Sequence, residues 1–155
     1  MIDKQKKIEK ARDLFLSGFN CAQAVAAAFA AELGMDEKNA LRLASGFGGG
    51  VGGTRHVCGA VSGMCMVASS VLGYDEADET EGKKYLYATI QRMVAQFTEQ
   101  YQAVDCRDLL KRNGIQAQAE PSKRTPEYYR TRPCVRYVEA CAAIVCDMLS
   151  EEKES

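Results

Sequence analysis

Apolar residues recur every three or four positions along most of the chain, the spacing that places them on one face of an α-helix. The longest such stretch covers 80–103, where the apolar stripe consists of Leu86, Ile90, Met93, Val94, Phe97 and Tyr101. No segment alternates apolar and polar residues in the way that predicts a β-strand. The pattern predicts helices over 4–17, 20–33, 36–45, 58–72, 80–103, 106–113 and 133–149.

The predicted helix over 58–72 differs from the others because it is nearly uncharged. A helix that is apolar around its whole circumference belongs in the interior of a protein. We therefore predict an all-α, single-domain bundle of about five to seven helices, with this helix at its centre. The domain covers 1–150, and 151–155 form a solvated acidic tail.

Two segments interrupt the helical pattern. Residues 46–53 contain six glycines in eight positions and are predicted to form a loop before the central helix. Residues 114–132 are polar, contain Pro121 and Pro126, and are predicted to form a long loop. Loops of that length often carry function or move.

The composition narrows the class of protein. A chain of 155 residues, 46% of them apolar, fits one domain with a real core. Charged residues make up 26% and the net charge is −1, so we expect neither nucleic acid nor an anionic membrane as a partner. The N-terminus leads into an amphipathic helix rather than a signal peptide, and no apolar stretch is long enough to span a bilayer. We expect a soluble, cytoplasmic protein.

Seven cysteines are many for a cytosolic chain of this size, and their odd number leaves at least one unpaired. In a reducing compartment, clustered cysteines more often bind metal or take part in redox reactions than form structural disulfides.

Four cysteines fall in the first turn of a predicted helix: Cys21, Cys58, Cys106 and Cys134. A capping box begins at Asn20, Asp105 is a good N-cap residue, and Pro133 suits a first helical position. The N–H groups and the positive dipole end at a helix start stabilise a thiolate, the form that attacks disulfides and binds metals. The four positions therefore indicate a thiolate cluster.

The other three cysteines, Cys65, Cys141 and Cys146, fall inside predicted helices and are interpreted as small buried hydrophobic residues. Cys58 and Cys65 lie about 10 Å apart along one helix, whereas a disulfide needs Cα atoms within about 7 Å. The same holds for Cys134 and Cys141. Any disulfide or shared metal therefore joins different helices.

Two chemistries suit the four helix-start cysteines. Pairs of low-pKa thiols can cycle through a disulfide, and four thiolates can bind an iron–sulfur cluster or zinc. Their spacings of 37, 48 and 28 residues are non-local, and no Cys-x-x-Cys signature of zinc ribbons or thioredoxins occurs. The residues leave both chemistries open.

The glycine-rich segment matches no nucleotide-binding motif, because no strand precedes it and no Gly-Lys-Ser/Thr follows. Its glycines, Gly52 and Gly53 among them, instead indicate a backbone that approaches a helix, a cluster or a small anion closely. Arg55 favours an anion. His56, the only histidine, lies two residues before Cys58 and can tune its thiolate, donate a proton or act as a ligand, or simply lie in solvent.

The motif Cys58-Gly59-Ala60-x-x-Gly63 follows this segment, with lone cysteines on either side at Cys21, Cys106 and Cys134. This arrangement resembles the C-GCAxxG-C-C family of small redox-active proteins over nearly the whole chain. The resemblance implies that the family's four characteristic cysteines fall on the four helix-start positions. A looser similarity to the cluster-binding part of split-Soret cytochromes favours an iron–sulfur or other metal centre, although the haem motif is missing.

We therefore predict a redox-active cysteine protein that exchanges electrons with an unknown redox partner. The four cysteines would act as disulfide partners or cluster ligands, with Gly59 and Gly63 permitting close backbone approach. In disulfide exchange, Cys58 would be the attacking thiolate because its glycine-rich surroundings suggest accessibility.

Two alternatives belong to other classes of protein. One is a non-enzymatic module that binds a small anion or other small ligand through the glycine-rich segment and Arg55. The other is a helical interaction protein, in which the alanine-rich face over 22–31 packs against a second copy to form a homodimer.

Overall fold

The computed structural model describes residues 2–154 and confirms the all-α prediction. Its elements are α1 (Lys4–Leu16), α2 (Cys21–Ala28), α3 (Ala30–Leu33), α4 (Glu37–Ala44), the 3-10 turn η1 (Ser45–Phe47), α5 (Gly48–Val51), α6 (Gly59–Leu72), α7 (Thr80–Tyr101), α8 (Cys106–Arg112), α9 (Pro126–Thr131) and α10 (Cys134–Glu154). Over these residues there is no β-strand, only an isolated antiparallel bridge between Val57 and Asp105. None of the described helices is long and apolar enough to cross a membrane.

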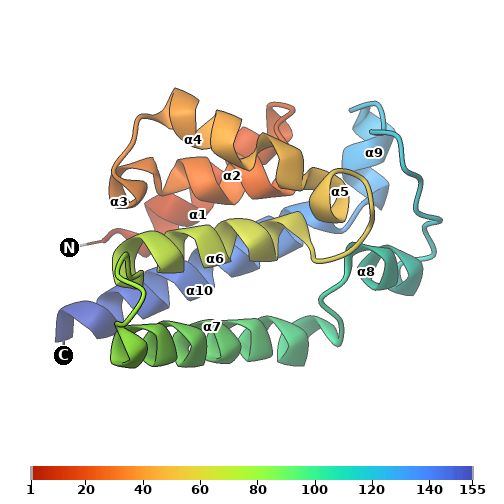
Figure 1. Cartoon of the computed structure of the whole chain (residues 1–155). Coiled ribbons are helices and arrows are strands. Elements are labelled where there is room, and N and C mark those ends of the chain that lie inside the picture. Colours follow the sequence, from red (N-terminus) through yellow and green to blue (C-terminus); the bar gives the residue numbers. More distant parts are fainter. Residues whose placement is uncertain (1, 155) are drawn as a thin grey trace.

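The helices α1, α2, α6, α7 and α10 pack around one apolar core (Figure 1). α2 contacts α1, α4, α6 and α10, and α6 also contacts α7 and α10. Phe15, Phe29, Met64 and Phe97 are among the largest side chains that are fully buried. Seven residues of α6 are buried, Met64 among them, whereas Ser69, Ser70 and Val71 are exposed, so the prediction of a buried central helix is confirmed for the part of α6 before Ser69.

The starts of α2, α6 and α10 lie at the same end of the bundle, and α8 lies there too (Figure 1). The start of α1 and the end of α10 lie at the opposite end of the bundle (Figure 1). This up-and-down path brings together helix starts that are far apart in the sequence.

α2 and α6 pack with their backbones in close approach. The predicted capping box fixes the start of α2: Gln23 N donates to Asn20 Oδ1 at 2.9 Å, and Asn20 N donates to Gln23 Oε1 at 3.0 Å. A Cβ added at Gly63 would lie 2.9 Å from Ala22 O and 3.0 Å from Val25 Cβ. The alanines of α2 are buried in this packing. The prediction that this alanine-rich face contacts a second copy is wrong for α2, because the face is covered within the chain.

Replacing Gly63 with alanine is expected to lower the free energy of unfolding by about 1–3 kcal/mol, because the new methyl group overlaps the backbone of α2. Urea denaturation measures this loss. Gly46→Ala is the matched control, since an added Cβ at Gly46 meets nothing within 4 Å. Equal stability of the two variants would contradict the close approach of α2 and α6.

The glycine-rich segment over 46–53 precedes the central helix as predicted, and most of it is compact, forming η1 and α5. Gly49 and Gly50 adopt left-handed backbone conformations, with φ of 62° and 66°. A Cβ at Gly50 would lie 2.6 Å from His56 O and 2.7 Å from Cys106 Cβ. The predicted close backbone approach therefore exists, and its target is the segment that carries Cys106.

Three further boundaries differ from the sequence prediction. The helix predicted over 20–33 breaks at Phe29, whose side chain is fully buried. The loop predicted over 114–132 contains α9, which begins where the Thr125 hydroxyl caps the Tyr128 N–H. The final helix extends to Glu154, and Arg92 of α7 pairs with Glu151 at 3.2 Å. Glu151, Lys153 and Glu154 are helical but exposed.

Candidate functional site

The four helix-start cysteines come together at one end of the bundle. Cys21, Cys106 and Cys134 are the first residues of α2, α8 and α10, and Cys58 is the N-cap residue of α6. All four line one cavity of about 50 Å³, which we call the inner cavity. A cavity of that size admits a few water-sized groups and no drug-sized ligand.

Backbone hydrogen bonds hold Cys58 and Cys106 beside each other. Cys58 N donates to Val104 O at 2.9 Å, and Cys106 N donates to His56 O at 2.6 Å. These bonds flank the Val57–Asp105 bridge, so the starts of α6 and α8 are joined directly. Gly50 makes room for this junction.

The thiols of Cys21 and Cys134 share a hydrogen bond. This bond lowers the pKa of Cys134, burial opposes it and nearby arginines support it, and the pKa comes to about 7. The same bond, together with burial, raises the pKa of Cys21 well above its usual value. Above about pH 7 the pair therefore holds one proton, with Cys21 as the donor and Cys134 as the thiolate.

Cys58 does not have the accessibility that we predicted for an attacking thiolate, since it is only 5% exposed. Burial raises the pKa of its thiol to about 12, although the backbone N–H groups of Val61 and Ala60 lower it. The helix start thus supplies the expected donors, but desolvation outweighs them. Cys134 is also buried, at 9% exposure, so the two thiols differ in pKa rather than in accessibility.

Cys106 contacts a cation. Arg55 Nη1 donates to Cys106 Sγ at 3.4 Å, and Arg55 Nε donates to Gln118 O at 2.7 Å. Burial raises the pKa of Cys106, while the hydrogen bond from Arg55 lowers it. Arg55 is itself buried, at 9% exposure, and it lines the inner cavity as a candidate anion-binding residue should.

Arg124 and Arg132 also line the inner cavity, and the sequence analysis missed them. The guanidinium of Arg124 stacks 4.7 Å from the ring centroid of Tyr128, and that of Arg132 lies 5.1 Å from the same ring. Both arginines fall in the segment predicted as a polar loop. The available signal was the group of arginines and tyrosines over 124–132, just before Cys134.

The remaining predicted residues lie at different distances from the cysteines. Gly59 lines the inner cavity, where a Cβ would lie 3.3 Å from Cys21 Cβ. Gly63 packs against α2 and lies outside the cavity wall. The side chain of His56 is exposed and does not line the cavity. The three cysteines interpreted as structural, Cys65, Cys141 and Cys146, also lie outside its wall, and Cys141 and Cys146 are buried.

A second hollow of about 290 Å³, which we call the outer pocket, adjoins the inner cavity. Gly52 and Gly53 line it, and the backbone at Gly53 lies against Ala119 with no room for a Cβ. The two hollows share six wall residues: Asn20, Gly49, Arg55, Arg124, Tyr128 and Arg132. The predicted anion-binding glycines and the cysteines therefore meet at one common wall.

The four thiols have the right donor chemistry for zinc or an iron–sulfur cluster. Over residues 2–154, however, no three side chains of His, Cys, Asp or Glu lie close enough together to hold one metal ion. In this arrangement the cysteines do not form a mononuclear metal site such as zinc.

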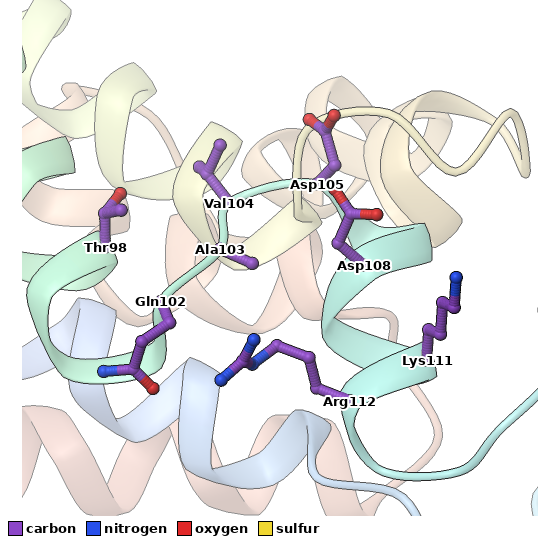
Figure 2. Close-up of a pocket in the computed structure, with 8 residues that line it drawn as sticks. All are labelled: Thr98, Gln102, Ala103, Val104, Asp105, Asp108, Lys111 and Arg112. Atoms are coloured by element: carbon purple, nitrogen blue, oxygen red, sulfur yellow. The ribbon is translucent and has the colours of Figure 1, made fainter.

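A larger hollow of about 660 Å³ lies between the end of α7 and α8. Figure 2 shows its wall of acidic, basic and uncharged side chains: Thr98, Gln102, Ala103, Val104, Asp105, Asp108, Lys111 and Arg112. None of these residues carries a thiol, so the size of this hollow does not make it the redox site.

Comparison with known proteins agrees with the resemblance. The sequence model of one family, described as "Putative redox-active protein (C_GCAxxG_C_C)", matches residues 19–148. No curated protein matches the chain significantly, and neither does any solved structure.

Proposed function

The chain belongs to the C_GCAxxG_C_C family, and we propose that it carries out thiol–disulfide exchange with Cys134 as the attacking thiolate and Cys21 as its partner. The observation that carries this proposal is the hydrogen bond between the two thiols, which leaves Cys134 charged near neutral pH. A thiolate beside a protonated thiol is the arrangement that disulfide exchange requires.

The reaction proceeds in two balanced steps. The Cys134 thiolate attacks one sulfur of a disulfide substrate, forming a mixed disulfide and releasing one substrate half as a thiolate, which takes up a proton. Cys21 then loses its proton and attacks the Cys134 sulfur, which releases the second half as a thiol. The protein loses two electrons to the substrate and ends with a Cys21–Cys134 disulfide; the reverse reaction reduces the protein.

An iron–sulfur or zinc centre is the second candidate, favoured by the meeting of four cysteines at one cavity. A mononuclear zinc site would require the thiols to draw closer together than they lie here. In an iron–sulfur cluster each thiolate binds a different iron atom, so the thiols need not converge on one point. The two candidates differ in metal content, colour and thiol count, which one preparation can measure.

Anaerobic purification, followed by assay of iron, zinc, sulfide and free thiols, tests both candidates. We expect a colourless, metal-free protein that loses two thiols on oxidation with hydroxyethyl disulfide, and peptide mapping should find Cys21 joined to Cys134. A visible absorption band with iron and sulfide would instead establish the cluster. A disulfide between other cysteines would overturn the assigned pair.

A further inference from the structure

The outer pocket carries an excess of positive charge. Arg55, Arg124 and Arg132 line it, whereas none of its lining residues is an aspartate, glutamate, lysine or histidine. Within residues 2–154 no carboxylate lies within ion-pair distance of these three guanidinium groups. Three cations therefore share a small space without a fixed counter-ion.

The neighbours of these arginines orient them without neutralising them. Arg124 donates to the carbonyl oxygens of Phe15 and Phe19 at 3.3 and 3.0 Å. Arg132 donates one hydrogen bond, to Ser122 Oγ at 2.9 Å. Its guanidinium group carries five N–H donors. Oriented guanidinium groups with donors to spare are suited to bidentate binding of carboxylate and other oxyanions.

The thiol site does not balance this charge. Even as a thiolate, Cys134 supplies one negative charge to a wall that carries three positive charges. The inner cavity, at about 50 Å³, holds little beyond the reacting atoms of a substrate. The rest of the substrate must therefore be recognised elsewhere, and the outer pocket of about 290 Å³ shares the arginine wall.

We propose that the outer pocket binds a negatively charged group of the substrate, and that this substrate is a small disulfide carrying a carboxylate or comparable anion near its sulfur atoms. This inference rests on the proposed function and adds the substrate class to it. With dithiodiglycolate as the probe, Cys134 attacks one sulfur and releases thioglycolate, and Cys21 then releases the second thioglycolate. The arginines take no part in bond making and hold the carboxylate.

Three disulfides of similar size and different charge test the substrate class: dithiodiglycolate, a dianion; hydroxyethyl disulfide, which is uncharged; and cystamine, a dication. Each oxidation rate is divided by the rate of the same disulfide with mercaptoethanol, which removes intrinsic reactivity. At low salt we expect the dianion to react about tenfold faster than the neutral disulfide and the dication to react slowest. The preference should shrink as salt is added.

Arg132→Met should reduce the ratio of dianion to neutral rates to near one, and Arg132→Lys should restore part of it. The ratio is the readout because Arg132 also lowers the pKa of Cys134, so its loss slows every disulfide together. Arg130→Met is the matched control, since Arg130 is exposed on α9 and lines neither hollow.

Calorimetric titration with inorganic sulfate separates this inference from the proposed function. We expect Cys134→Ser to bind sulfate, and Arg132→Met to bind it at least about tenfold more weakly than the wild type. Equal rates for the three disulfides, or a sulfate affinity that is the same in Arg132→Met as in the wild type, would overturn the inference while leaving thiol exchange intact. Arg132-dependent sulfate binding without oxidation by any disulfide would overturn the proposed function and leave the anion site standing.

Discussion

Cys134→Ser is expected to slow oxidation of the protein by hydroxyethyl disulfide about 300-fold at pH 7, even if Cys58 replaces it as the attacking thiol. The pKa values of about 7 for Cys134 and about 12 for Cys58 imply thiolate populations that differ by about 10⁵-fold at that pH. The Cys58 thiolate is the more basic of the two and therefore intrinsically more reactive, which offsets roughly 300-fold of this population difference. The net loss remains large because the population difference dominates.

The same variant gives a pH signature that a purely structural role would not produce. In the wild type, absorbance at 240 nm should rise through a midpoint near pH 7 as Cys134 becomes a thiolate, and the oxidation rate should rise with it. Because deprotonation activates the thiol, the rate falls as the pH drops below 7. Both changes should vanish in Cys134→Ser.

Cys146→Ser provides the control for this experiment. Cys146 lies on the same helix, outside the inner cavity, and burial raises the pKa of its thiol to about 11. Its loss should leave the step near pH 7 and the oxidation rate unchanged. A step near pH 7 that survives in Cys134→Ser would assign the thiolate to another cysteine.

The position of Cys21 was predictable because capping is local, whereas neither Cys58 nor Asp105 makes a side-chain capping hydrogen bond. The sequence Asn-x-x-Gln predicts the reciprocal cap that Asn20 and Gln23 form, and Cys21, directly after Asn20, is the first residue of α2. The convergence of the cysteines on one cavity depends instead on the up-and-down path of the helices, which local pattern does not determine. The resemblance to a redox family supplied that expectation.

Which cysteine has the lowest pKa was not predictable from the sequence, since the pKa depends on tertiary surroundings. Cys58 and Cys134 both lie at helix starts. Burial has the largest effect on the pKa of Cys58 and raises it, whereas the hydrogen bond from Cys21 has the largest effect on the pKa of Cys134 and lowers it. The arginine wall was missed for the same reason: Arg124 reaches the carbonyl of Phe15 across more than a hundred residues. Its segment looks like a polar loop until those contacts are known.

The glycines illustrate both outcomes. Gly63 lies in the family motif and was predicted to permit close approach. A Cβ at this position would lie only 2.9 Å from Ala22 O of α2, so the approach is close. Gly50 drew no separate prediction, yet it makes room for Cys106 and for the His56 carbonyl. A glycine-rich stretch shows that something approaches closely, but only the fold shows what approaches it.

Replacing Cys21 separates its two roles, as hydrogen-bond donor and as resolving thiol. In both Cys21→Ser and Cys21→Ala, attack by Cys134 should still produce a mixed disulfide with hydroxyethyl disulfide, and no thiol at position 21 remains to release it. We expect this adduct to accumulate in nearly every chain, visible by intact mass spectrometry, whereas the wild type proceeds to an internal disulfide. Rapid loss of the adduct in both variants would mean that Cys58 or Cys106 resolves it.

The two substitutions should differ in the pKa of Cys134. Alanine removes the hydrogen bond that contributes most to lowering this pKa, so burial should raise it by at least about one pH unit. Serine keeps a hydroxyl donor and should leave the pKa nearer 7. Titration at 240 nm measures the difference, and coincident curves for the two variants would show that the arginines, rather than Cys21, maintain the thiolate. If the adduct accumulates in both variants and the pKa of Cys134 rises only in Cys21→Ala, then Cys21 is both the hydrogen-bond donor and the resolving thiol.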